Sequence, residues 1–117
     1  MKLEITPNRL RGDVVIPPSK SLSHRAIIAA AMAEGRSNIT NLKFSEDIKA
    51  TTEAMESLGA KFQMGEDYEV IDGVDSFTRI KDEIQCRESG STIRFMIPVA
   101  LLAQGRVTFK GEGRLCK

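Results

Sequence analysis

An internal repeat constrains the fold of this chain more than any other feature of its sequence. Aligned with itself at an offset of 70 residues, the chain shows the same sequence pattern twice: a small polar residue, an apolar helical stretch, a Gly-Arg pair and a strand-like segment. The matched pairs are Ser21 and Ser91, Ile27 and Ile97, Ala30 and Ala100, Ala33 and Ala103, Gly35 and Gly105, and Arg36 and Arg106. Such a repeat indicates one supersecondary unit that is used more than once. We expect an α/β fold with one complete unit and part of a second, truncated at Lys117.

Local patterns predict the order of elements within the unit. Alternating apolar residues stopped by proline or glycine predict short strands at residues 3–6 and 14–16. Helical apolar spacing predicts helices that begin near Lys20, Ser45 and Ser91, with Gly35 and Gly59 as stops for the first two and residue 104 as the end of the third. Pro98 should bend the third helix. Further strands are expected at 37–40, 84–86 and 106–110, and a hairpin at 61–64 and 69–71.

Composition excludes several classes of function. Seventeen Lys and Arg residues against 16 Asp and Glu give a formal charge of +1, too little for general nucleic-acid affinity. No apolar run is long enough to span a bilayer or to form a signal peptide, so we expect a cytoplasmic protein without a membrane partner. Cys86 and Cys116 are expected to be reduced thiols, and a single histidine makes a structural zinc site improbable.

The most informative stretch is Pro-Pro-Ser-Lys-Ser-Leu-Ser-His-Arg at residues 17–25. Lys20 and Ser21 fall in the first turn of a predicted helix, where unpaired amides and the helix dipole favour an anion. Arg25 follows Ser21 by one turn, so the two side chains share a face. An ammonium, a hydroxyl and a guanidinium converging on one point would bind phosphate or carboxylate. On spacing alone, an ordinary capped helix with solvated charges is an equally good interpretation. A nucleotide P-loop is excluded, because Val14 and Ser19 occupy its two glycine places.

A second motif, Glu-Ser-Gly-Ser-Thr-Ile-Arg at residues 88–94, has the same design. Gly90 would let a ligand approach the backbone, Ser91 or Thr92 would cap the helix, and Arg94 follows within one turn. Alone, this motif indicates no more than a capped helix. Because it occupies the repeat position of the first motif, we expect the two to contribute to one ligand surface.

The chain thus carries P-S-K-S-x-S-x-R-A at 18–26, G-S-x-x-R at 90–94 and G-E-x-R at 111–114. In order and spacing these motifs resemble those of the 5-enolpyruvylshikimate-3-phosphate (EPSP) synthases, and the resemblance covers essentially the whole chain. The resemblance implies an enolpyruvyl transferase fold of two globular domains, each built from three βαβαββ units. Residues 17–117 would then be part of the N-terminal substrate-binding domain. Residues 1–16 would hold a first strand that belongs to the C-terminal domain, which this chain lacks.

The resemblance also implies an activity and roles for individual residues. The family transfers the enolpyruvyl group of phosphoenolpyruvate to the 5-hydroxyl of shikimate-3-phosphate and releases phosphate; glyphosate competes for the phosphoenolpyruvate pocket. Lys20, Ser21 and Arg25 would bind shikimate-3-phosphate, and Lys20 and Gly90 would border phosphoenolpyruvate. Ser91 and Arg94 would support the site. No general acid or base is assigned here, and neither a metal nor a cofactor is expected.

The chain departs from the family pattern beside the second motif. Arg87 and Glu88 stand where many members have Gly-Asn, and Phe95 replaces a common proline. An acidic residue beside an anion pocket needs a partner, and we expect Arg87 to pair with Glu88. His24 is interpreted as a residue of the helix surface.

Two alternative functions stay open from the sequence. UDP-N-acetylglucosamine enolpyruvyl transferase shares the fold and the chemistry, but that family usually places asparagine after the lysine and lacks the Ser-x-Arg continuation. A non-catalytic anion-binding module is the alternative from another class. If the main interpretation holds, the isolated chain should be inactive, because the facing domain is missing and a further family arginine falls just beyond Lys117.

Overall fold

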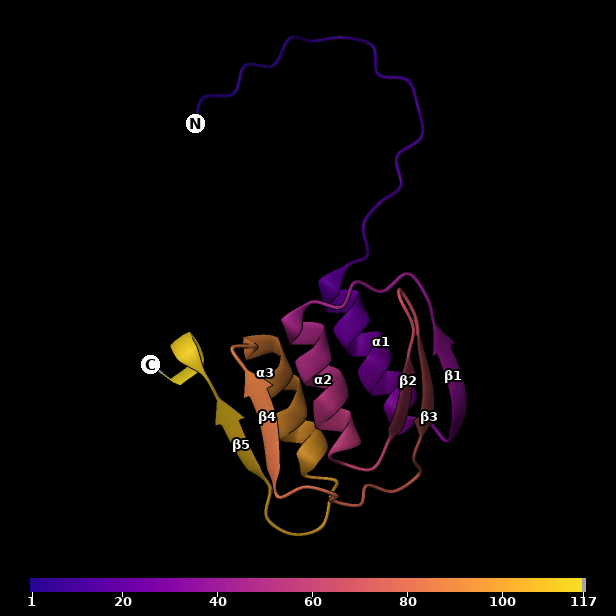
Figure 1. The fold of residues 1–117 in the computed structure, drawn as a ribbon, viewed down its shortest axis with the longest axis vertical. Coiled ribbons are helices and arrows are strands. Elements are labelled where there is room, and N and C mark those ends of the chain that lie inside the picture. Colours follow the sequence, from indigo (N-terminus) through magenta and orange to yellow (C-terminus); the bar gives the residue numbers. More distant parts are fainter. Residues whose placement is uncertain (117) are drawn as a thin grey trace.

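The computed structural model describes residues 1–116; Lys117, where we expected a truncation, lies outside the described residues. The described residues form three α-helices and five strands, so the α/β prediction is confirmed (Figure 1). The helices are α1 (Lys20–Met32), α2 (Glu46–Glu56) and α3 (Gly90–Ala100). The strands are β1 (Gly35–Ile39), β2 (Lys61–Met64), β3 (Glu69–Gly73), β4 (Glu83–Arg87) and β5 (Thr108–Gly111), followed by a 3-10 turn, η1 (Gly113–Cys116).

The helices begin where serine side chains cap them. The hydroxyl oxygens of Ser19, Ser45 and Ser89 accept hydrogen bonds from the amides of Leu22, Ile48 and Thr92, at 3.4, 3.4 and 3.1 Å. Each cap satisfies one of the amides that a helix N-terminus leaves unpaired. The caps of α1 and α3 lie 70 residues apart, at the offset of the sequence repeat. The predicted correspondence of the two helix starts is therefore confirmed.

Two details of α3 differ from the prediction. Ser89 caps this helix, not Ser91 or Thr92, because Ser89 has the extended backbone of a cap and the residues after it are already helical. The helix ends at Ala100 and does not continue to residue 104. Pro98 lies inside the helix near its C-terminus and has no amide hydrogen to donate, which favours an early end.

Residues 1–116 contain two small sheets. In the first, β3 lies between β1 and β2 and pairs antiparallel with both, which confirms the predicted hairpin. In the second, β4 and β5 pair in parallel, and α3 connects them. Central α2 contacts α1, α3 and β4, while α1 covers β3. Apolar side chains from all of these layers meet in one core, among them Ile27, Ile48, Met55, Ile71, Ile84 and Met96, each no more than 1% exposed.

Close backbone contact fixes the C-terminal end of α1 against the first sheet. The amide of Val74 donates to the carbonyl of Ala31 at 3.0 Å. A Cβ atom at Gly73 would collide with the carbonyl oxygens of Ala30 and Ala33. Only glycine therefore allows β3 to approach the last turn of α1 this closely.

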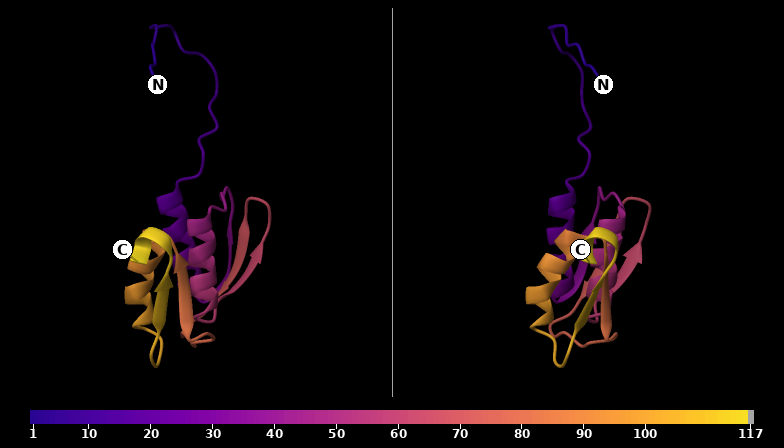
Figure 2. Two further views of the ribbon diagram at one scale, coloured as in Figure 1. Left: turned by 60° about the vertical axis from the view of Figure 1, so that its left-hand side comes forward. Right: turned by 90° about the vertical axis from the view of Figure 1, so that its left-hand side faces the viewer.

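Residues 1–17 extend away from the body and are exposed (Figure 2). The strands predicted at 3–6 and 14–16 are not present, and in this structure the predictions are wrong. Their alternating apolar side chains, including Leu3 at 75% and Val14 at 84% exposure, have no sheet to pack against among the described residues. Strand formation requires a hydrogen-bonded neighbour. The first unit is thus seen without its opening strand, and the assignment of residues 1–16 to another domain stays a prediction.

No helix formed by residues 1–116 combines the length and the apolar character needed to cross a membrane.

Candidate functional site

The helices α1, α2 and α3 run in the same direction, so their N-termini lie at one end of the molecule (Figure 1). A helix N-terminus carries unpaired amides and about half a positive charge, which attract anions. The first turn of α2 contains Glu46 and Asp47, whereas the first turns of α1 and α3 contain no acidic residue. The helices that begin with the two sequence motifs are therefore those whose positive ends are not neutralised by their own side chains.

Of the predicted residues of the first motif, Ser21 and Arg25 lie one turn apart on the same face of α1. Lys20 is the first residue of the helix; its ammonium group forms an ion pair with Asp47 of α2. Arg25 is exposed, and its Nη1 donates to the carbonyl oxygen of Ser21 at 2.9 Å. The guanidinium carbon lies 5.0 Å from the centre of the Phe95 ring on α3. This cation–π contact directs Arg25 toward the second motif.

The second motif presents an open backbone. Gly90 is the first residue of α3, and no atom lies within 4 Å of the position that a Cβ would occupy. Ser91 and Arg94 are exposed, and neither side chain makes a hydrogen bond or ion pair with the described part of the chain. The structure therefore leaves a hydroxyl and a guanidinium accessible beside an unobstructed helix start.

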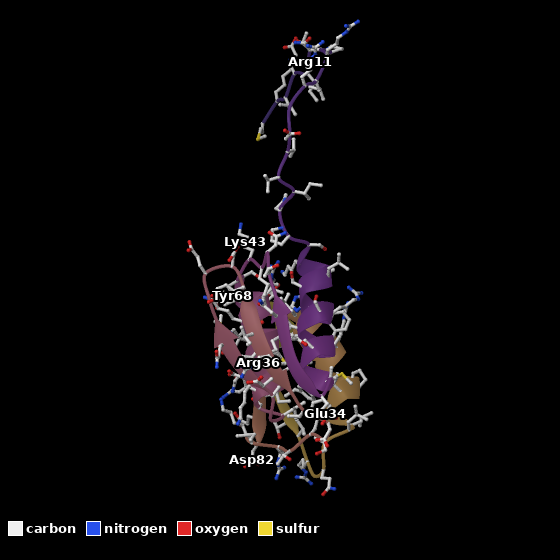
Figure 3. The ribbon with its side chains drawn as sticks, turned by 90° about the vertical axis from the view of Figure 1, so that its right-hand side faces the viewer. Arg11, Glu34, Arg36, Lys43, Tyr68 and Asp82 are labelled. Atoms are coloured by element: carbon white, nitrogen blue, oxygen red, sulfur yellow. The ribbon has the colours of Figure 1, made fainter. Side chains whose placement is uncertain are left out.

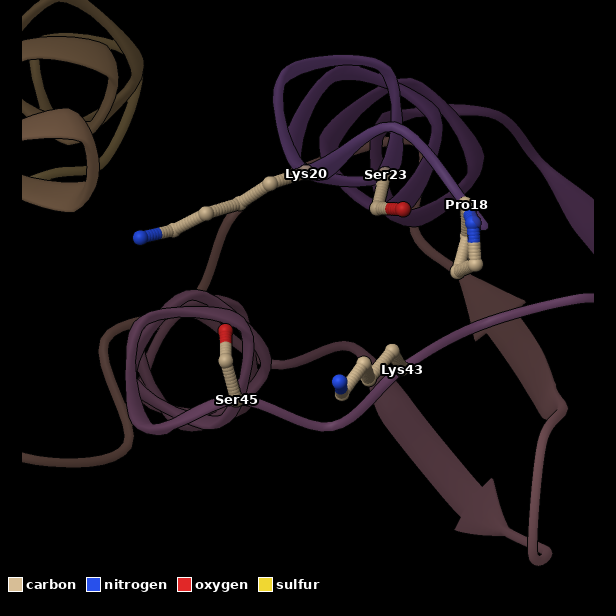
Figure 4. Close-up of a pocket in the computed structure, with 5 residues that line it drawn as sticks. All are labelled: Pro18, Lys20, Ser23, Lys43 and Ser45. Atoms are coloured by element: carbon tan, nitrogen blue, oxygen red, sulfur yellow. The ribbon is translucent and has the colours of Figure 1, made fainter. Parts of the chain in front are cut away.

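A pocket of about 240 Å³ lies between the starts of α1 and α2 (Figure 4). Pro18, Lys20, Ser23, Lys43 and Ser45 line it. Figure 4 shows Lys43 and Ser45 reaching toward this space, while Lys20 extends over the start of α2. Lys43 forms no ion pair within residues 1–116 and lies near the start of α1 (Figure 3). Sequence reasoning missed Lys43. Its position two residues before the cap Ser45 was the available signal.

The pairing expected beside Glu88 is wrong. Arg87 has a φ of 51°, in the left-handed region, and its guanidinium pairs with Glu46 and Glu53 of α2, the latter at 2.6 Å. Glu88 is exposed and its carboxyl group lies against Gly113. The strand β4 is irregular between Gln85 and Arg87, which turns the Arg87 side chain toward α2.

The interpretation of His24 as a surface residue is also wrong, because this side chain is only 1% exposed. Its Nδ1 lies 2.7 Å from the hydroxyl of Thr51 on α2. Burial lowers the pKa of His24 below its ordinary value; Asp47 opposes this effect, and Lys20 and Arg25 reinforce it. The lowered pKa favours the neutral form of this imidazole. Sequence reasoning missed it because the apolar stripe was traced along the neighbouring face of α1.

Within residues 1–116, no three His, Cys, Asp or Glu side chains lie close enough together to hold a metal ion.

The fold and the site together define a class: an α/β protein with repeated units whose helix starts lie at one end of the molecule, with the basic side chains of Lys20, Arg25 and Arg94 on or near them. Comparison with known proteins gives the family. Residues 5–117 match the family model of EPSP synthase (3-phosphoshikimate 1-carboxyvinyltransferase). The chain therefore belongs to the EPSP synthase family.

Individual relatives agree with this assignment. The chain is 50% identical over 120 residues to the 3-phosphoshikimate 1-carboxyvinyltransferase of Clostridium perfringens strain 13, with 99% of this chain covered. It is 46% identical over 125 residues to that of Clostridioides difficile strain 630, with 98% covered. The fold matches a solved EPSP synthase from Acinetobacter baumannii with a TM-score of 0.83 and 26% identity, over 91% of this chain and 25% of that one. The chain spans only 28% and 29% of the two sequence relatives.

Proposed function

We propose that the protein containing this chain transfers the enolpyruvyl group of phosphoenolpyruvate to the 5-hydroxyl of shikimate-3-phosphate, with release of phosphate. The observation that carries the proposal is the pair of unneutralised helix starts, α1 and α3, each with a motif of this family. Both substrates are polyanions, so the reaction needs cations and amide donors that hold two negatively charged molecules together.

The geometry supports separate roles for the two motifs in binding the two substrates. In this proposal Lys20, Ser21 and Arg25 bind shikimate-3-phosphate, since Lys20 and Ser21 begin α1 and Arg25 lies one turn after Ser21. Lys20 and the open backbone at Gly90 border phosphoenolpyruvate, and Ser91 and Arg94 support that half of the site. This chain supplies one wall only.

The ion pair between Lys20 and Asp47 fits this role. Both side chains are partly exposed, at 54% and 28%, so solvent screens the pair and it contributes little to stability. Asp47 holds the ammonium group over the start of α2, and an incoming phosphate or carboxylate can share it. Lys43 adds a second positive charge on the other side of the same pocket.

The remaining groups of the proposal lie outside this chain. We infer a facing C-terminal domain, with the acid and base groups, because the relatives continue far beyond the matched region. Closure of such a domain would exclude water from the site. The cytoplasmic location expected from the sequence stays a prediction.

A phosphate-release assay with both substrates tests the proposal. In the full-length protein, Lys20→Ala should lower kcat/KM by about tenfold to more than a hundredfold, since a hydrogen-bonded charged contact contributes about 1.5–3 kcal/mol. Lys61→Ala is the matched control, because Lys61 is an exposed lysine on β2. Unchanged kinetics in Lys20→Ala would contradict the assignment.

The isolated chain gives the complementary measurement. In the same assay residues 1–117 should show no turnover, because half a site cannot close around its substrates. Activity within about tenfold of the full-length protein would place the catalytic groups inside this chain, against the proposal. Turnover of UDP-N-acetylglucosamine in place of shikimate-3-phosphate would instead favour the related transferase.

A further inference from the structure

A chain of buried polar groups crosses α1, α2 and α3 beneath their N-termini. His24 Nδ1 lies 2.7 Å from Thr51 Oγ1, which lies 2.8 Å from Thr92 Oγ1. Thr92 Oγ1 in turn lies 2.7 Å from the hydroxyl of Ser89, the residue that caps α3. All four side chains are at most 1% exposed. We call His24, Thr51, Thr92 and Ser89 the polar relay.

Each member of the polar relay depends on its neighbours for hydrogen bonds, so the relay is sensitive to the loss of any member. Each hydroxyl has a single proton to donate, and Thr92 Oγ1 also lies 3.3 Å from the carbonyl oxygen of Asp47, which can only accept. Ser89 Oγ already accepts the amide of Thr92 at 3.1 Å. Removing the Thr51 hydroxyl therefore leaves His24 Nδ1 without a partner and takes one of three partners from Thr92 Oγ1. Buried polar groups without partners are unfavourable, so the surrounding helices would shift to satisfy them.

The relay connects the two motifs of the site. Lys20, Ser21 and Arg25 precede or flank His24 on α1, while Gly90 and Ser91 lie between the two relay members of α3. The helices α1 and α3 each pack on α2, so their relative position depends on how both are held there. Thr51 of α2 is the group that bonds to both sides.

If the role of these hydroxyls were purely structural, they would be ordinary buried groups whose hydrogen bonds stabilise the core. Thr52, the next residue of α2, is such a group: it is 2% exposed, its hydroxyl donates to Glu69 of β3 at 2.8 Å, and the carbonyl oxygen of Ile48 lies 3.3 Å away. Thr51 and Thr52 thus have the same chemistry, burial and helix, but only Thr51 joins the starts of α1 and α3. Comparing variants at Thr51 and Thr52 therefore separates an effect on the relative position of α1 and α3 from an effect on the stability of the protein.

We propose that His24 and Thr51 are positioning residues, which fix the distance between the half of the site on α1 and the half on α3. This inference rests on the proposed function, because it assigns the two halves to two substrates that react with each other. Reactions between two bound molecules are sensitive to small displacements, so a shift of one helix start lowers the rate even when each substrate still binds.

Kinetics of the full-length protein with both substrates test the inference. Thr51→Val should lower kcat/KM by about tenfold, the equivalent of one lost hydrogen bond of about 1.4 kcal/mol. Thr51→Ser keeps the hydroxyl and should restore activity to within about twofold. Thr52→Val, the matched control, should stay within about twofold of the wild type although it also loses a buried hydrogen bond, in this case to Glu69.

Amide hydrogen exchange supplies a readout that does not depend on turnover. Thr51→Val should speed exchange in the first turns of both α1 and α3 by about fivefold or more, and Thr52→Val should not. If Thr51→Val fails to fold, Thr92→Val interrupts the same relay. A wild-type protein that converts neither substrate would contradict the proposed function and leave the exchange result as the test of the relay. Equal effects of the two valine substitutions on kinetics and exchange, or no rescue by serine, would overturn the inference.

Discussion

Replacing Phe95 by leucine tests how the structure holds Arg25. The guanidinium lies 5.0 Å from the ring centre and is also bonded to the carbonyl of Ser21 at 2.9 Å. Leucine keeps the apolar contact with the core but removes the aromatic face. A cation–π contact at an exposed site contributes about 0.5–1 kcal/mol. Phe95→Leu should therefore raise the KM for shikimate-3-phosphate by about twofold to fivefold, at about tenfold per 1.4 kcal/mol.

A double-mutant cycle gives this prediction its specificity. Arg25→Ala removes the charged contact itself, worth about 1.5–3 kcal/mol, and should lower kcat/KM by about tenfold to more than a hundredfold. If Phe95 acts through Arg25, adding Phe95→Leu to Arg25→Ala should cause no further loss, because nothing remains to be positioned.

Steady-state kinetics of the four proteins at constant pH and salt measure the cycle. The reasoning would be refuted if Phe95→Leu changed kcat/KM by the same factor with and without Arg25. In that case the ring affects the site through packing against α1, where it also lies 6.2 Å from the His24 ring.

The remaining predictions concern stability, measured by chemical denaturation of the full-length protein. Stability should fall as the pH drops below about 6.5, because burial lowers the pKa of His24 in the folded state and the unfolded chain binds the proton first. His24→Leu should flatten this slope. Burial raises the pKa of Glu69 above its ordinary 4.5, so its contribution declines as the pH rises through and above that value. Glu69→Gln should therefore stabilise the protein at neutral pH. Arg87→Ala should cost about 1–2 kcal/mol more than Arg87→Gly, since both lose the ion pairs but only alanine keeps the left-handed strain.

Each of these predictions has a distinct contrary result. An unchanged pH slope in His24→Leu would mean that other groups cause the acid sensitivity. A Glu69→Gln variant that is less stable at neutral pH would mean that the hydrogen bond from Thr52 outweighs the cost of burying the carboxylate. Equal stability of the alanine and glycine variants at Arg87 would mean that the backbone relaxes at this position.

Local sequence signals predicted the helices and the repeat because those features depend on nearby residues. Serine caps and apolar spacing act within one or two turns, so α1 and α2 begin where expected. The cap of α3 was misplaced by two residues, since Ser89, Ser91 and Thr92 all have side chains suited to a cap. The extended backbone conformation of Ser89 determines which of them is the cap, and this conformation depends on where β4 ends.

The parts of the site that sequence reasoning missed depend on contacts between elements. His24 bonds to a residue 27 positions away, and the hydroxyls of Thr51 and Thr92 are 41 positions apart. Arg87 reaches back 34 positions to Glu53 and 41 to Glu46. Spacing within one segment holds no information on these partners. The strands at 3–6 and 14–16 were wrongly predicted for the same reason, because a strand exists only with a hydrogen-bonded neighbour, which the local pattern does not reveal.

The common direction of α1, α2 and α3 has a consequence for the protein without ligand. Side by side, helices that point the same way place like partial charges together, and they repel one another. The acidic residues Glu46 and Asp47 relieve this repulsion at α2 alone. An anion bound beside the starts of α1 and α3 would therefore reduce this repulsion as well as make contacts of its own. A substrate that enters such a site also acts as part of the structure: it increases the protein's resistance to unfolding by an amount that grows with its concentration.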